Sequence, residues 1–338
     1  MPRLTQSIKN LTRLTSLSTR VLADVAVGTA FVQRPPSYTV PAFVNLGIAG
    51  YFGGGSDGVR ISGIDKITFS ADTRTTLSAT LTTARQSLAG MANSAVAGYF
   101  GGGSDSVGNL SGVDKITFSA DSKTTLSATL TTARAQLAGM ANSSVAGYFG
   151  GGDDGSYLSG IDKITFPADT KTTLSATLTT ARSQLASMAN SGVAGYFGGG
   201  EDSVASLSGI DKITFPADSK TTLSATLTAV RRFLAGMANS GVAGYFGGGT
   251  ASTNIIDKIT FSADTKTTLS ATLTTARSQL AGMANSGIAG YFGGGSDSVG
   301  NVSGIDKITF PLDTKTTLSA TLTSGRFLLS GMADSGVI

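Results

Sequence analysis

Short stretches of hydrophobic and β-branched positions, each bounded by turn residues, follow one another from about residue 50 to the end of the chain. GVAGYF, IDKITF and TTLSATLT have the composition of strands. In TTLSATLT, Leu77, Ala79 and Leu81 alternate with Ser78 and Thr80, which is typical of a half-buried strand. A fourth stretch, LAGMANSG, ends in a turn. We expect strands A (LAGMAN), B (VAGYFG), C (DKITF) and D (TTLSATL).

These stretches form one unit of about 48 residues that occurs six times. GYFGGG begins at Gly50, Gly98, Gly147, Gly195, Gly244 and Gly290. An arginine follows strand D in every copy, namely Arg85, Arg134, Arg182, Arg231, Arg277 and Arg326. Repeated four-stranded meanders favour an all-β, six-bladed β-propeller of antiparallel blades. A solenoid is the alternative, but its terminal units usually diverge as caps, and these six hardly diverge.

The unit resembles the kelch repeat, which combines an arginine, a small-residue strand and an aromatic strand ending in paired glycines. Thr179–Gly200 fits the first half of that pattern through Arg182, Tyr196, Phe197 and Gly198, and IDKITF fits the second half. The resemblance covers about Gly50–Ile338. The family's strand-D tryptophan is leucine in this chain, and the glycines are tripled. The resemblance implies a propeller that binds partners.

Two segments could complete the first blade. The chain contains the order B-C-D-A six times, so the last strand A, within Phe327–Ile338, could pair with the first strand B and close the ring. The N-terminal PAFVNLGIAG (Pro41–Gly50) could fill the same place. Leu329, Gly331 and Met332 match the repeat better, which favours the C-terminal strand.

Composition argues against catalysis. The 338 residues include no cysteine and no histidine, and Glu201 is the single glutamate. Disulfides, thiolate nucleophiles and the usual general base are therefore excluded. We predict that the protein is not an enzyme and uses no cofactor or metal. The 45 glycines suit inner strands that crowd together near a propeller axis.

The net charge of +4 belongs to residues 1–35, because the rest of the chain is balanced. We expect these residues to form a basic, partly helical arm that anchors the protein, followed by an extended connector (36–49) and the propeller (50–338). Its basic residues include Arg3, Lys9, Arg13 and Arg20, and its apolar positions include Leu4, Ile8, Leu11, Leu14 and Leu17. A frayed tail, a helix resting on the propeller and a membrane-surface peptide are the alternatives. No apolar run reaches 18 residues, so no membrane span is predicted.

Variation among the copies concentrates in the B–C loops and, less strongly, the D–A connectors. Up-and-down topology places both on one face, where we predict partner binding. The alternative is that the loop sequences vary because nothing constrains them. The distinctive side chains there are Asp57, Arg60, Asp105, Asp153, Asp154, Tyr157, Glu201, Asp202, Arg232, Phe233, Asp297 and Phe327. We expect the acids to be solvated rather than to bind Ca²⁺, because the fifth copy has none. The repeated arginines should be structural, bonding carbonyls or the aspartate of DKITF between blades.

Near-identical GYFGGG and KITF repeats are similar to those of tail-fibre and other virion proteins of marine and cyanobacterial tailed phages. That resemblance implies a structural, host-attachment protein of the virion. Its partners would be other virion proteins, reached through the arm, and a host-surface glycan, but not nucleic acid. It would act as a homo-oligomer or within a larger assembly. A cytoplasmic kelch-type protein-interaction module is the alternative, and an enzyme acting on glycans is a third.

Overall fold

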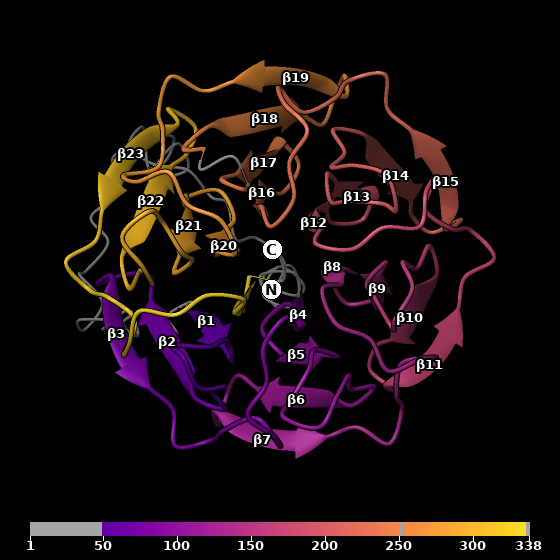
Figure 1. Cartoon of the computed structure of the whole chain (residues 1–338), viewed down its shortest axis with the longest axis horizontal. Coiled ribbons are helices and arrows are strands. Elements are labelled where there is room, and N and C mark those ends of the chain that lie inside the picture. Colours follow the sequence, from indigo (N-terminus) through magenta and orange to yellow (C-terminus); the bar gives the residue numbers. More distant parts are fainter. Residues whose placement is uncertain (1–48, 251–252, 336–338) are drawn as a thin grey trace, which may run out of the picture. The chain divides into compact units, whose positions relative to one another are not determined.

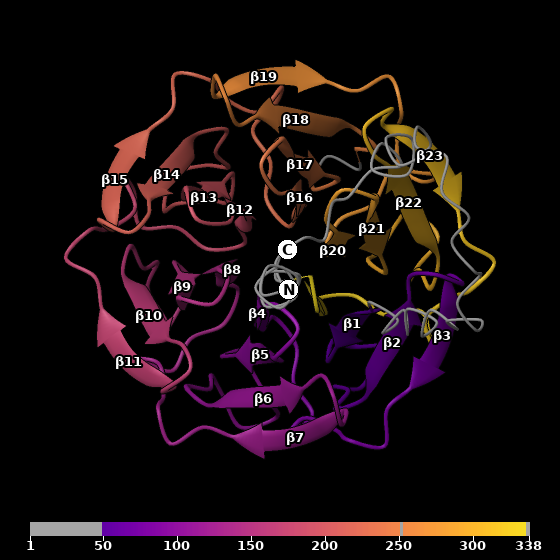
Figure 2. The same ribbon diagram turned by 180° about the vertical axis from the view of Figure 1, so that it is seen from behind.

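Six four-stranded antiparallel sheets surround one axis in a computed structural model of the protein (Figure 1; seen from behind in Figure 2). The structure describes residues 49–250 and 253–335, and this part contains strands but no helix. The predicted all-β, six-bladed propeller is therefore confirmed. The predicted N-terminal arm, including its partly helical character, lies outside the described residues.

Each blade is described from its inner strand outwards. Blade one comprises β24 (Ser330–Ala333), β1 (Ala49–Gly53), β2 (Ile64–Thr68) and β3 (Thr73–Thr76). Blade two comprises β4 (Ala89–Asn93), β5 (Ala97–Gly101), β6 (Val113–Thr117) and β7 (Ser122–Thr125), and blade three β8 (Ala138–Asn142), β9 (Ala146–Gly150), β10 (Ile161–Thr165) and β11 (Thr170–Thr173). Blade four comprises β12 (Ala186–Asn190), β13 (Ala194–Gly198), β14 (Ile210–Thr214) and β15 (Ser219–Thr222). Blade five comprises β16 (Ala235–Asn239), β17 (Ala243–Gly247), β18 (Ile256–Thr260) and β19 (Thr265–Thr268), and blade six β20 (Ala281–Asn285), β21 (Ala289–Gly293), β22 (Ile305–Thr309) and β23 (Thr314–Thr317).

The outer strand differs from its prediction. Strand D was expected over Thr75–Leu81, but β3 ends at Thr76. In the next five residues only two backbone bonds reach the blade, from the Leu77 amide to the Ile64 carbonyl and from the Leu81 amide to the Ser62 carbonyl. The alternating burial of Leu77 and Leu81 therefore comes from an irregular segment that continues alongside Ile64 and Ser62, where Leu81 joins the buried cluster between blades one and two.

The hydrophobic core lies between adjacent blades. Met91 and Tyr99 of blade two share a buried cluster with Phe149 and Phe166 of blade three. The rings of Tyr99 and Phe166 stack with centroids 5.1 Å apart. At Gly101 an added Cβ would lie 2.6 Å from Cζ of Phe149, so this glycine of GYFG allows the next blade to approach. Each blade thus has a specific surface for its neighbour.

The C-terminal strand closes the ring. β24 pairs antiparallel with β1, with Met332 opposite Tyr51. Met332 is fully buried, and its sulfur packs against Gly98 of blade two. The expectation that favoured the C-terminal strand over the N-terminal segment is confirmed.

Deleting Phe327–Ile338 should therefore destabilise the whole propeller. The deletion exposes the edge of β1 and removes Leu329 and Met332, each of which contributes about 1.5–3 kcal/mol by burial. Thermal unfolding followed by circular dichroism should show a midpoint at least 10 °C lower (about 2–4 °C per kcal/mol in a domain of this size) or no cooperative transition. An unchanged midpoint would contradict closure by β24.

One residue departs from the repeat at the closure. Asn93, Asn142, Asn190 and Asn239 each accept, through Oδ1, a backbone amide of the next blade's A–B turn. Asp334 occupies the equivalent position in β24's turn. Burial raises the pKa of Asp334 from 3.8 to about 6, and the charge of nearby Asp121 adds to this, against a hydrogen bond from Ala49 and the charge of Lys66.

The raised pKa predicts a loss of stability as the pH rises from about 4 through the folded pKa of about 6. In this range the unfolded chain gives up the Asp334 proton before the folded chain does, so the free energy of unfolding falls and levels off at about pH 7. Asp334→Asn should remove that slope. Because Asp334 is only partly buried, the variant should be more stable at pH 7 by about 1 kcal/mol after solvent screening. Urea unfolding at pH 4, 5, 6 and 7 tests this, and parallel pH profiles of the two proteins would contradict it.

Candidate binding face

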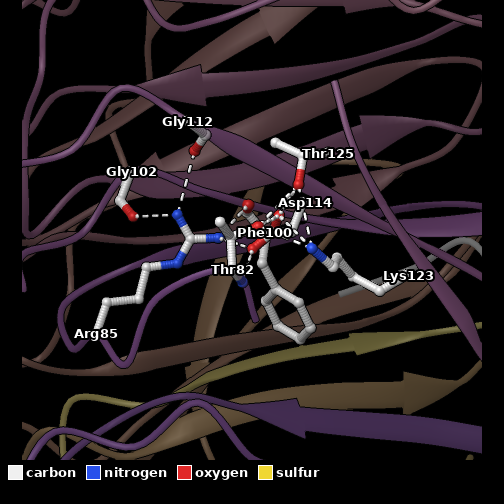
Figure 3. Close-up of polar contacts among 8 residues, drawn as sticks. All are labelled: Thr82, Arg85, Phe100, Gly102, Gly112, Asp114, Lys123 and Thr125. Atoms are coloured by element: carbon white, nitrogen blue, oxygen red, sulfur yellow. Dashed lines mark hydrogen bonds and ion pairs between the residues drawn. The ribbon is translucent and has the colours of Figure 1, made fainter. Parts of the chain in front are cut away.

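A buried arginine–aspartate pair organises the edge of each blade where the loops begin (Figure 3). Arg85, in the connector between blades one and two, donates from Nη2 to the Phe100 carbonyl (3.1 Å) and to Oδ2 of Asp114 (2.8 Å). Its Nη1 donates to the Gly102 carbonyl at 3.1 Å. Asp114, the aspartate of DKITF, also accepts the backbone amide and the hydroxyl of Thr82. The pair therefore fastens the connector onto blade two.

All six copies form this pair. The partners are Arg85–Asp114, Arg134–Asp162, Arg182–Asp211, Arg231–Asp257, Arg277–Asp306 and Arg326–Asp65. Each arginine is at most 3% exposed. Burial opposes the charge of Asp211, but hydrogen bonds from Thr179, the charge of Arg182 and a bond from Thr222 outweigh it and hold its pKa below 3.8. These are the partners expected from the sequence, and the arginines are not available to a ligand.

Breaking one pair should be costly. Asp211→Asn keeps the shape of the side chain but leaves the Arg182 guanidinium buried without a counter-charge, which costs about 3–5 kcal/mol. Chemical unfolding should show this loss at pH 7. Asp154→Asn, at an exposed loop position, is the matched control and should leave the unfolding midpoint unchanged. Equal midpoints for the two variants would contradict a structural role for the pair.

A second set of polar contacts joins each blade to the next and was not expected from the sequence. Nζ of Lys66 lies 2.7 Å from Oδ2 of Asp121 in the following blade, and Oη of Tyr51 donates to Oδ1 of the same carboxylate at 3.0 Å. The other lysine–aspartate pairs are Lys115–Asp169, Lys163–Asp218, Lys212–Asp264, Lys258–Asp313 and Lys307–Asp72. The signal was present, because this aspartate follows DKITF at constant spacing in every copy.

The B–C loops and D–A connectors form one face, as predicted. The backbone of Ser56, in the B–C loop of blade one, exchanges hydrogen bonds with Phe327 in the connector that leads into this blade. The amide of Gly55 donates to the carbonyl of Arg85, in the connector into blade two. The left-handed φ of +98° at Gly55 makes this approach possible. Each loop is thus supported by the connectors on both sides.

The loop acids mainly support their own loops. Asp105 accepts the amides of Val107 and Gly108 through Oδ1, and these bonds lower its pKa. The same local capping occurs at Asp57, Asp153, Asp154, Asp202 and Asp297. Arg60 is half-buried beside them. Among the described residues no three metal-ligating side chains gather where they could hold an ion.

The centre of this face holds a small funnel. Its outer ring consists of the equivalent connector residues Ser87, Gln136, Gln184, Phe233, Gln279 and Leu328. The amide of each donates to the carbonyl of the preceding one at 2.7–2.9 Å, which makes a closed circle of six backbone hydrogen bonds. The inner strands form the floor, and an added Cβ at Gly90 or Gly236 would overlap a neighbour's carbonyl. The funnel encloses about 110 Å³.

One sector of the face breaks the sixfold repetition. Oε1 of Glu201 accepts the hydroxyl of Tyr157 at 3.2 Å and Nε2 of Gln184 at 2.6 Å. Its Oε2 pairs with Nη1 of Arg232, whose guanidinium lies 5.8 Å from the ring centroid of Phe233. The structure therefore unites four of the predicted residues in one network across blades three to five. It does not join them to Asp57, Asp297 or Phe327.

Sequence reasoning missed the funnel ring apart from Phe233. Three glutamines at one position of the connector were the available signal.

The predicted anchor residues in 1–35 lie outside the described residues. Within the described part, no helix is long and apolar enough to span a membrane. No protein-family model matches the chain, and no curated protein shows significant sequence similarity to it. The six-bladed propeller is consistent with the kelch-like repeats seen in the sequence.

Proposed function

We propose that the protein is a non-enzymatic structural and adhesion component of a tailed-phage virion, either a tail fibre or a tail-associated protein. In this role the propeller is a rigid support, and its loop face meets a host surface or a neighbouring virion protein. The basic arm of residues 1–35 attaches it to the particle. The virion assignment rests on the similarity of the repeats to those of phage tail proteins.

The observation that carries the proposal is the contrast between a repeated scaffold and one varied face. The residues that join blades are nearly identical in all six copies, whereas no two of the six B–C loops have the same sequence. Loops held by a rigid scaffold are the usual place for recognition. The loops of the second and sixth copies differ only at Leu110 and Val302, whereas the loops that carry Tyr157 and Glu201 are more distinctive.

The chemistry of the scaffold also favours binding over catalysis. The buried aspartates, arginines and tyrosines hold the blades together, as in the Arg182–Asp211 pair and the Tyr51–Asp121 contact. Burial, with the hydrogen bond to Asp169 next, raises the pKa of Tyr99 far above 10, so this phenol is not poised to exchange a proton. The variable face offers hydrogen-bonding and aromatic side chains for contact.

Removing residues 1–35 tests the assignment. A tagged full chain should co-sediment with purified particles, whereas the truncated chain should be absent from them, because the basic arm is the proposed attachment. The truncated propeller should keep its thermal unfolding midpoint, since its core lies within the six blades. Western blots of gradient-purified particles and circular dichroism provide the two measurements.

Two outcomes would overturn the proposal. Normal incorporation of the truncated chain would show that the arm is not the anchor. A full chain that is absent from particles and co-purifies with a cellular protein would instead support a kelch-type interaction module.

A further inference from the structure

We infer that the central funnel of the loop face binds one neutral sugar residue, with Phe233 as its aromatic wall. This inference deepens the proposed function, on which it rests, by naming the chemistry of the host-surface ligand. It is carried by the lining of the funnel, the hydrogen-bonding state of its rim and the network that holds Phe233.

The lining selects against charged ligands. The residues around the funnel are Ser, Gln, Leu, Ala, Gly and one Phe, so no ionisable side chain faces it. The charges beside the rim, on Arg232 and Glu201, are paired with each other. A phosphate, carboxylate or sialic acid would lose its hydration without gaining a counter-charge. An uncharged ligand with both polar and apolar surface is the better match.

The rim offers side-chain amides and little else for hydrogen bonding. The backbone amides and carbonyls of the ring residues already bond to each other in the closed circle. Gln279 makes no side-chain hydrogen bond to the described residues, and Nε2 of Gln136 donates to none of them. Oε1 of Gln184 is buried without a partner among them. Amides both donate and accept, which suits the hydroxyl groups of a sugar.

The aromatic wall is held in place before any ligand arrives. Arg232 lies against the Phe233 ring, and Glu201, which also accepts bonds from Tyr157 and Gln184, fixes Arg232. Around the circle of six, Phe233 stands opposite Ser87, the smallest rim residue. Space is therefore left beside the ring for the apolar C–H face of a sugar. A funnel of about 110 Å³ suits a single ring rather than a peptide segment.

The repeat itself supplies variants that should fold. Phe233→Gln installs the residue found at the same position in three other connectors, with the same left-handed backbone at Gln136, Gln184 and Gln279. Ser87→Gln uses the same residue to fill the space opposite Phe233. Val96→Thr, at an exposed position of the A–B turn between β4 and β5, is the matched control. Thermal unfolding of all three should stay close to that of the unchanged chain.

The test is saturation-transfer NMR and calorimetry on the full chain. The probes are the methyl glycosides of mannose, galactose, glucose and N-acetylglucosamine, with N-acetylneuraminic acid as the charged comparison. We expect binding of at least one neutral glycoside and at least tenfold weaker binding of N-acetylneuraminic acid. Phe233→Gln and Ser87→Gln should each weaken binding of the neutral ligand at least tenfold, while Val96→Thr leaves it unchanged.

Three results would overturn the inference: no neutral glycoside binds, the acidic sugar binds best, or both rim variants bind like the unchanged chain. Particle incorporation is scored separately. If the chain is incorporated but binds no sugar, the inference fails and the virion role stands. If it binds sugar but is absent from particles, the virion role fails and the site stands.

Discussion

Each blade contacts the next through one repeated buried surface, and the ring forms only when six such contacts close together. The surface consists of a tyrosine–phenylalanine stack, a glycine that admits the neighbour's phenylalanine, and a lysine–aspartate pair, as at Tyr99, Phe166 and Gly101. A change at one interface alters the angle between two adjacent blades, and the other five interfaces must compensate for it. Closure therefore favours the same interface residues in all six copies, because interiors are close-packed and do not stretch.

Closure also decides where the sequence is free to change. The strands and the residues that pair blades are constrained on both sides, whereas the B–C loops are constrained only at their bases by the connectors. Loop acids such as Asp105 and Asp202 accept hydrogen bonds from amides of their own turns, so these bonds hold the loops in shape without contacts to the core. Variation there leaves the ring intact, which is why one face can diversify while the scaffold is copied.

Much of this architecture could be predicted from the sequence, because the same pattern of strands and turns occurs six times in register. Strand order, blade number, ring closure by Met332 and the Arg–Asp pairing follow from register alone. The end of β3 could not be predicted, since Leu77 and Leu81 belong to an irregular segment whose burial alternates as it does in a strand. Neither could the funnel, because neighbours such as Gln136 and Gln184 lie a full repeat apart and meet only when the circle closes.

A ring of equal units presents equal surroundings to any ligand on its axis, so a ligand without sixfold symmetry can be oriented only where the repetition breaks. At blades three to five, where the repetition breaks, the charges of the substituted residues balance each other. Arg232 brings a charge to the rim, and Glu201 neutralises it, so the half-buried pair adds no net charge to the funnel. Phe233 replaces a glutamine but keeps the backbone bond to Gln184 that the circle requires. The substitutions therefore change the chemistry of the face and leave intact the contacts that hold the ring.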